Sequence, residues 1–111
     1  MELWEKFYEL GESIEDKEYT LEEMKNIQTC WKDLSKVFLN HIKVDDLLDM
    51  FTSLDSTILA DNQTGNELLQ EFASYLCYAS DRMNINRWCR LQLTLENAIN
   101  NRYWEESKHN N

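Results

Sequence analysis

The chain contains no proline and only two glycines, Gly11 and Gly65. Tight turns between β-strands depend on such residues, so their scarcity argues against a β-rich fold. No stretch approaches the 18 or more apolar residues of a membrane span. The N-terminal residues have neither the basic start nor the apolar core of a signal peptide. The sequence therefore predicts a helical protein in the cytoplasm that makes no contact with a membrane.

Cysteine is also scarce, and Cys30, Cys77 and Cys89 are an odd number at wide spacings. Each lies among apolar residues at helical positions, which indicates reduced core side chains rather than a disulfide or redox pair. The spacings of cysteine and histidine match no zinc pattern. The sequence therefore predicts no metal site and no cofactor.

A catalytic set is missing as well. The only histidines are His41, at an expected helix end, and His109, in the polar tail, and no glycine-rich phosphate loop is present. A nucleophilic Ser or Cys needs a base beside it. Glu71 and Glu96 fall on the polar sides of their helices, so neither is the buried carboxylate that would indicate acid–base catalysis. We therefore predict no catalytic residues and no enzymatic activity.

What the chain has in abundance is negative charge: 21 Asp and Glu against 11 Lys and Arg, with a net charge of −10. Such a field repels nucleic acids and anionic membranes and attracts basic proteins. The acidic residues are densest between Glu9 and Glu23, where seven carboxylates accompany one lysine. A second acidic segment, residues 45–71, has seven carboxylates and no basic residue. The natural partner is therefore a basic protein.

Apolar residues recur every three or four positions through most of the chain, as they do in amphipathic helices. Thr20 and Glu23 form a Thr-x-x-Glu capping box before the longest helix, Thr64 and Glu67 repeat it, and Gly11 suits a helix C-terminus. We predict a single domain, 1–111, folded as an all-α compact bundle of about five helices with a frayed polar tail at 107–111. The expected helices cover residues 2–10, 21–39, 44–60 (as one or two short helices), 67–80 and 85–105, and residues 61–66 are the clearest expected loop.

Some carboxylates in the first acidic stretch have a structural explanation, since Glu22 and Glu23 suit a helix N-terminus. Others do not, and the connector 12–19 is polar apart from Ile14 and Tyr19, which can fix it to the core or anchor a partner. The predicted partner-binding residues are Glu12, Glu15, Asp16, Glu18, Tyr19 and Glu22, with Asp45, Asp46 and Asp49 as a second set.

A reserve candidate for a binding edge is an arginine-rich patch with two tryptophans near the C-terminus. Arginine and tryptophan are enriched in protein interfaces. Intramolecular pairing of these arginines with acidic segments is the favoured interpretation. The patch comprises Arg82, Arg87, Trp88, Arg90, Arg102 and Trp104.

In size, acidity, helicity and lack of a catalytic set, the chain resembles the small cytoplasmic immunity proteins that bacteria make against their own nuclease toxins. Such proteins occur in contact-dependent growth inhibition and in bacteriocin systems. The resemblance implies a stoichiometric inhibitor that covers a basic toxin's active-site cleft with carboxylates in place of substrate phosphates. We expect a monomer that forms a 1:1 complex with a toxin, for which a ribonuclease is the candidate.

Three alternatives remain open. A DNA-mimicking anti-restriction or anti-CRISPR protein would use the same negative field against a large effector. A secretion chaperone would be a dimer with an exposed apolar groove. A small regulatory or scaffold module would have no tightly bound basic partner.

Overall fold

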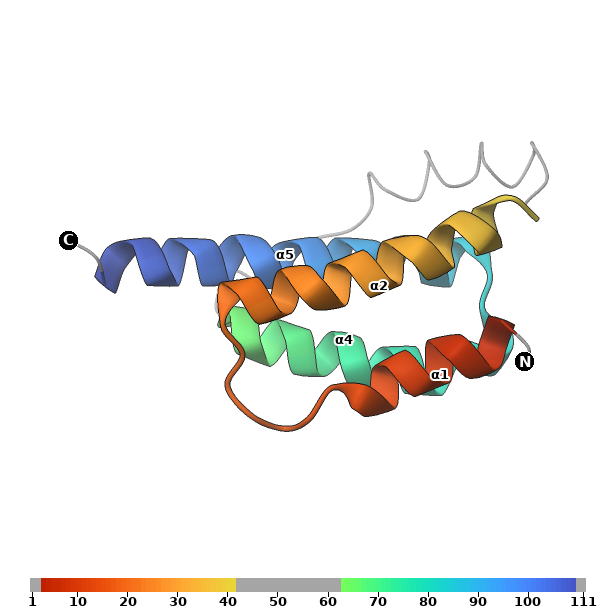
Figure 1. Cartoon of the computed structure of the whole chain (residues 1–111), viewed down its shortest axis with the longest axis horizontal. Helices are drawn as coiled ribbons and strands as arrows, with labels where there is room; N and C mark the ends of the chain where they lie inside the picture. Colours follow the sequence, from red (N-terminus) through yellow and green to blue (C-terminus); the bar gives the residue numbers. More distant parts are fainter. Residues whose placement is uncertain (1–2, 42–62, 110–111) are drawn as a thin grey trace.

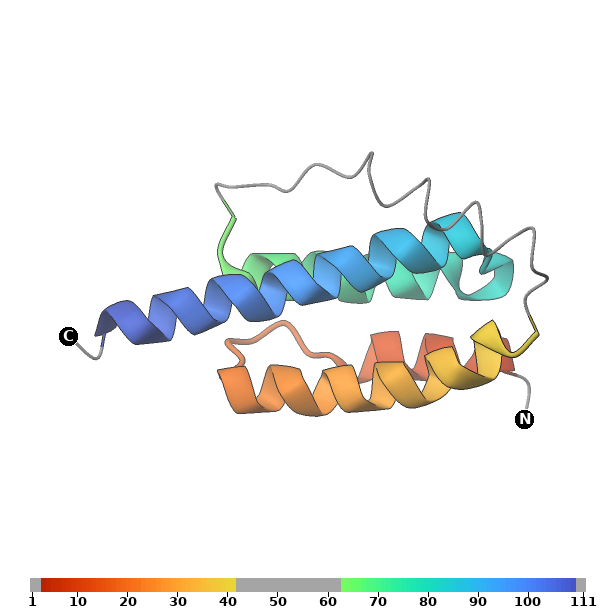
Figure 2. The same ribbon diagram turned by 90° about the horizontal axis from the view of Figure 1, so that it is seen from above.

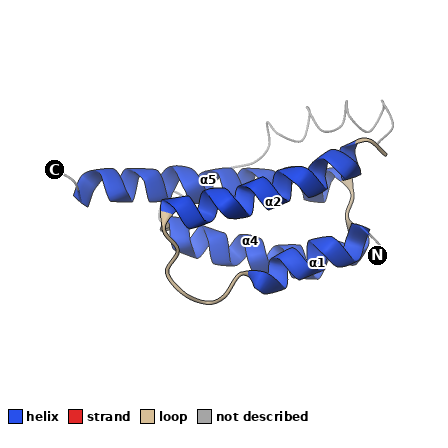
Figure 3. Ribbon diagram, in the orientation of Figure 1, coloured by secondary structure: helices blue, strands red, loops and turns tan. Residues whose placement is uncertain are grey.

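The computed structural model describes residues 3–41 and 63–109 of the chain. Within these residues lie α1 (Leu3–Ser13), α2 (Leu21–Leu39), α4 (Gly65–Ala79), the 3-10 helix η1 (Ser80–Arg82) and α5 (Ile85–His109), and no strand (Figure 3). The predicted all-α class is confirmed, with four α-helices in the described part of the chain where the sequence predicts about five in all. The helix or helices expected at 44–60 lie outside the described residues, as do Asp45, Asp46 and Asp49.

The four helices form a ring in which each packs against two neighbours, in the order α1, α4, α5, α2. Neighbours in this ring run antiparallel to each other (Figure 1). Seen from above, α4 and α5 form one layer and α1 and α2 the other (Figure 2). The C-terminal turns of α5 extend beyond the other helices (Figure 2). The helices of the described residues thus form an antiparallel four-helix bundle.

Aromatic side chains from all four helices meet in the core. The ring of Trp31, on α2, is fully buried and lies 5.5 Å from Phe7 of α1, 5.4 Å from Phe72 of α4 and 6.1 Å from Trp88 of α5, measured between ring centroids. The indole N–H of Trp88 donates to the buried hydroxyl of Ser35 at 2.8 Å. Each helix therefore contributes one large ring to the core, and the N–H of Trp88 has a hydrogen-bond partner there. The contacts between these rings fix the helices relative to one another.

Both glycines lie inside helices, which corrects the predictions for them. The sequence predicts that Gly11 ends the first helix and that Gly65 belongs to a loop, but α1 continues to Ser13 and α4 begins at Gly65. Neither glycine has a positive φ. A Cβ at Gly11 would lie 2.6 Å from Cys77 Sγ, and one at Gly65 would lie 2.6 Å from the carbonyl oxygen of Ala98. Each glycine therefore permits two helices to approach closely.

Two further predictions are wrong. Cys30 is exposed on α2 rather than buried, whereas Cys89 is buried and Cys77 is partly buried. Residues 107–109 belong to α5 instead of a frayed tail. The capping box of Thr20 and Glu23 is confirmed as complete. Of the second predicted box, only one hydrogen bond is present: the Thr64 hydroxyl accepts from the N–H of Glu67.

Candidate functional site

The acidic connector between α1 and α2 is fastened to the bundle by its two apolar side chains. Ile14 and Tyr19 are 8% and 7% exposed. The Tyr19 hydroxyl accepts from the N–H of Glu15 at 2.7 Å, and the Tyr19 N–H donates to Asn66 Oδ1 of α4 at 3.0 Å. Tyr19 thus has the predicted fixing role, and its ring is packed into the core rather than presented to a partner.

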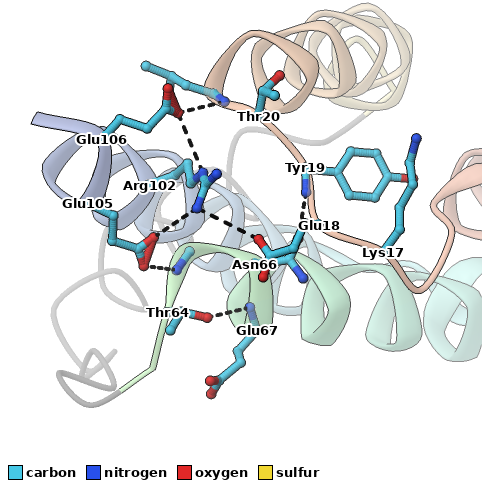
Figure 4. A network of polar contacts seen from close by, with 12 residues as sticks. Lys17, Glu18, Tyr19, Thr20, Thr64, Asn66, Glu67, Arg102, Glu105 and Glu106 are labelled. Atoms are coloured by element: carbon cyan, nitrogen blue, oxygen red, sulfur yellow. Dashed lines mark hydrogen bonds and ion pairs between the residues drawn. The ribbon is translucent and has the colours of Figure 1, made fainter. Parts of the chain in front are cut away.

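One predicted partner-binding residue, Glu18, belongs to an ionic network around Arg102 (Figure 4). The Arg102 guanidinium lies 3.7 Å from a carboxylate oxygen of Glu18, 3.7 Å from Glu105 and 3.5 Å from Glu106. Arg102 of the C-terminal patch is therefore paired within the molecule, as the sequence favours. Glu18 thereby links the connector to α5 through an exposed ion pair.

The two carboxylates beside Arg102 also hold the starts of two other helices. Glu106 accepts from the N–H of Leu21 at 3.0 Å, and Glu105 accepts from the N–H of Gly65 at 2.9 Å (Figure 4). The first amides of a helix have no partner within it and carry partial positive charge, so a carboxylate there is stabilising. These two hydrogen bonds stabilise the C-terminal part of α5, which extends to His109.

The other predicted carboxylates divide into paired and unpaired groups. Lys17 Nζ lies 3.9 Å from Glu15 and 3.5 Å from Glu23. Glu12, Asp16 and Glu22 are exposed, and none of them forms an ion pair with another residue of the described ranges. The acidic stretch is therefore only partly available for an external partner.

An open groove lies between α1 and the C-terminal end of α4 with η1, and its volume is about 690 Å³. We call it the acidic groove and define it by three aromatic and four acidic residues. The aromatic residues are Trp4, Tyr8 and Tyr78. The acidic residues are Glu5, Glu9, Glu12 and Asp81.

The carboxylates of the acidic groove lack internal cations. Glu5, Glu9 and Glu12 follow one another along one face of α1 at spacings of four and three residues. All the ion pairs between described residues involve Lys17 or Arg102, and none involves a residue of the groove. Like charges at this spacing destabilise a helix slightly, so helix stability does not explain them.

Hydrogen bonding fixes one carboxylate in the groove. The hydroxyl of Tyr8 donates to Glu12 Oε1 at 2.5 Å, and this hydrogen bond to a carboxylate raises the pKa of Tyr8 above its usual value. A smaller hollow of about 310 Å³ also includes Glu12 and Cys77 and extends to Asp16. The predicted residues Glu12 and Asp16 thus lie on one continuous acidic surface.

One thiol, that of Cys77, lies at the acidic groove. Burial raises the pKa of the Cys77 thiol at the groove, so the thiol is protonated and poorly nucleophilic at neutral pH. No three His, Cys, Asp or Glu side chains within residues 3–41 and 63–109 are grouped so that they could hold a metal ion. No helix in those ranges is long and apolar enough to span a membrane.

Of the predicted residues, Glu12 lines the acidic groove and Asp16 lines the adjoining hollow, whereas the other residues of the groove were not predicted. Trp4 and Tyr8 are spaced four apart beside the acidic stripe of α1, which is a signal that the sequence contains. Tyr78 and Asp81 come from the end of α4 and η1, and only the packing of α4 on α1 places them here. No protein-family model, curated protein or solved structure matches the chain. The fold and the groove define a class: a helical bundle with an acidic, aromatic-lined face.

Proposed function

We propose that the protein is an acidic immunity or inhibitor protein that binds a basic toxin and neutralises it in a 1:1 complex. The main support is a set of exposed carboxylates that pair with no cation of the described residues: Glu5, Glu9, Glu12 and Asp81 at the acidic groove and Asp16 in the adjoining connector. Unpaired carboxylates at neighbouring positions repel one another, and a bound cationic group would offset this repulsion. Their arrangement therefore favours binding to a basic surface.

The protein would inhibit the toxin by occupying its active-site cleft, without any chemical reaction. A ribonuclease is the candidate toxin, because its cleft must be positive in order to hold phosphates, and carboxylates can occupy the same positions. The net charge of −10 would speed the encounter by long-range attraction, in a manner that salt screens. Affinity would then depend on the groove and the exposed carboxylates in contact with the toxin.

The first experiment concerns the partner. The protein encoded by the gene immediately before this one is expressed alone and together with this chain, and growth and complex formation are measured. The proposal requires that this chain rescue growth and elute with the toxin as a 1:1 complex in size-exclusion chromatography. A DNA mimic would instead compete with nucleic acid for a large effector, and a secretion chaperone would elute as a dimer.

The second experiment concerns the surface. Glu9, Glu15 and Asp16 are replaced together by lysine; Glu18 is left unchanged because its replacement would disturb Arg102. We expect slower association with the toxin at low salt, by roughly tenfold or more, and a weaker dependence of the rate on salt.

The matched control variant replaces Asp33, Glu71 and Glu96 by lysine. These exposed carboxylates lie outside the acidic groove, and the change in net charge is the same. If the control slows association as much as the test variant, the proposed surface is wrong, because net charge alone would explain the effect.

A further inference from the structure

We infer that the acidic groove is a pocket for an arginine side chain of the basic partner. The inference rests on the proposed function and specifies which chemical group the groove binds. Charge complementarity identifies a cation, since Glu5, Glu9, Glu12 and Asp81 all line the groove without an internal counter-ion among the described residues. The aromatic residues identify the kind of cation.

Three large rings line the groove while remaining exposed to water. Trp4 is 41% exposed, Tyr8 43% and Tyr78 87%. Tyr78 therefore contributes almost nothing to the core, and helix formation does not explain a ring at its position. Aromatic faces attract cations, and a planar guanidinium stacks on them more effectively than a compact ammonium group does.

The carboxylates add directional acceptors for the same group. Tyr8 donates to Oε1 of Glu12, which orients this carboxylate and leaves Oε2 for another donor. Glu9 lies one turn before Glu12 on the same face of α1. A guanidinium presents five N–H donors in a fixed planar fork, so it can bridge carboxylates while its face contacts a ring. A lysine ammonium cannot do both in this way.

The end of α4 adds further negative potential. Ser80 and Asp81 line the groove directly after α4 ends at Ala79. The Ser80 hydroxyl donates to the carbonyl of Cys77 at 3.3 Å. The helix dipole also gives the C-terminal end of α4 partial negative charge, which favours a cation near it. The volume of about 690 Å³ falls within the range of ligand-binding clefts. It accommodates an arginine side chain together with neighbouring atoms of the partner.

The probes for the test are an arginine octapeptide and a lysine octapeptide, which have the same charge. Their affinities for the protein are measured by isothermal titration calorimetry at low and at physiological salt. We expect the arginine peptide to bind about five to ten times more tightly than the lysine peptide, which is the size of a cation–π and bidentate advantage. A simple acidic surface would bind both peptides equally.

Substitutions identify the residues of the groove that cause the preference for arginine over lysine. Tyr78→Ala should remove the preference for arginine and leave lysine binding nearly unchanged, and Glu9→Gln should weaken the binding of both peptides. The matched controls are Tyr103→Ala and Asp33→Asn, which alter an exposed ring and an exposed carboxylate outside the groove. Both controls should bind as the wild type does. Circular dichroism checks that every variant is folded.

The outcomes separate this inference from the proposed function. Equal affinities for the two peptides, or a preference that survives Tyr78→Ala, would overturn the arginine pocket and leave the inhibitor function standing. If the arginine preference depends on Tyr78 but the chain neither binds nor neutralises the adjacent gene's product, the pocket stands and the proposed function is wrong.

Discussion

Gly11 lies where α1 and α4 approach each other closely. A Cβ added there would lie 2.6 Å from Cys77 Sγ and 3.1 Å from the carbonyl oxygen of Ala73. Alanine normally stabilises a helix relative to glycine by up to about 1 kcal/mol. Overpacking against another helix costs about 1 to 3 kcal/mol, and here a backbone oxygen cannot move aside. The steric term should therefore exceed the gain in helix propensity.

We predict that Gly11→Ala lowers the free energy of unfolding by about 1 to 2 kcal/mol, measured by urea denaturation. Adding Cys77→Ala should recover part of this loss, because it removes the sulfur but not the nearby backbone. Lys6→Ala, at an exposed position of α1, is the control and should be nearly neutral. An increase in stability for Gly11→Ala would show that glycine is not needed for this helix contact.

At the scale of one helix, the start of α2 depends on a carboxylate. Glu23 accepts from the N–H of Thr20 at 3.0 Å and lies 3.5 Å from Lys17 Nζ. The hydrogen bond from the Thr20 backbone is the largest cause of a lowered pKa for Glu23, and Lys17 adds to it. In the unfolded chain the same carboxyl group takes up its proton at a higher pH. The capping contribution is therefore complete above about pH 5 and is lost as the pH falls through the lowered pKa.

We predict that Glu23→Gln makes stability less dependent on pH in the acid range. The glutamine amide oxygen still accepts from Thr20, but the side chain no longer titrates. The difference in urea midpoint between wild type and variant should be greatest near neutral pH and should shrink toward pH 3. Glu22→Gln, in the same exposed turn, should show a smaller change with pH. A difference that stays constant with pH would contradict this account of the cap.

The helices that the sequence predicted best are those whose ends are determined locally. The start of α2 follows from its capping box, and the start of α5 follows from Asn84, whose side chain accepts from the N–H of Arg87. The ends of α1 and α5 depend on contacts between distant segments. α1 passes through Gly11 because α4 lies against it, and the end of α5 is held by contacts to the starts of α2 and α4. Neither set of contacts can be inferred from the spacing of residues within one helix, because each joins segments that are far apart in the sequence.

At the scale of the whole molecule, the sequence gives the net charge but not its distribution over the surface. Counting residues cannot distinguish Glu18, which pairs with Arg102, from Glu12 and Asp16, which line hollows on the surface. The exposure of Tyr78 and its place beside α1 likewise depend on the packing of α4. The candidate site was therefore predicted only at Glu12, with Asp16 in the adjoining hollow.

On the proposed function, the unpaired acidic stripe of Glu5, Glu9 and Glu12 makes partner binding and stability compete. Glu9 lies between Glu5 and Glu12 on one face of α1, and like charges at this spacing cost a helix about 0.2 to 0.5 kcal/mol per pair. A net charge of −10 adds a general repulsion that a compact fold must overcome. Such a cost is acceptable where the same charges bind a partner.

We therefore predict that Glu9→Gln, which should weaken peptide binding, raises the urea midpoint at low salt. In high salt the difference from wild type should vanish, because the Debye length falls to about 3 Å at 1 M. Asp33→Asn is the control: Asp33 lies on α2 near Lys32 and Lys36, so removing its charge should not stabilise the fold. If Glu9→Gln lowers the midpoint at low salt, Glu9 makes a favourable contact in the folded protein, and its place in the groove is structural.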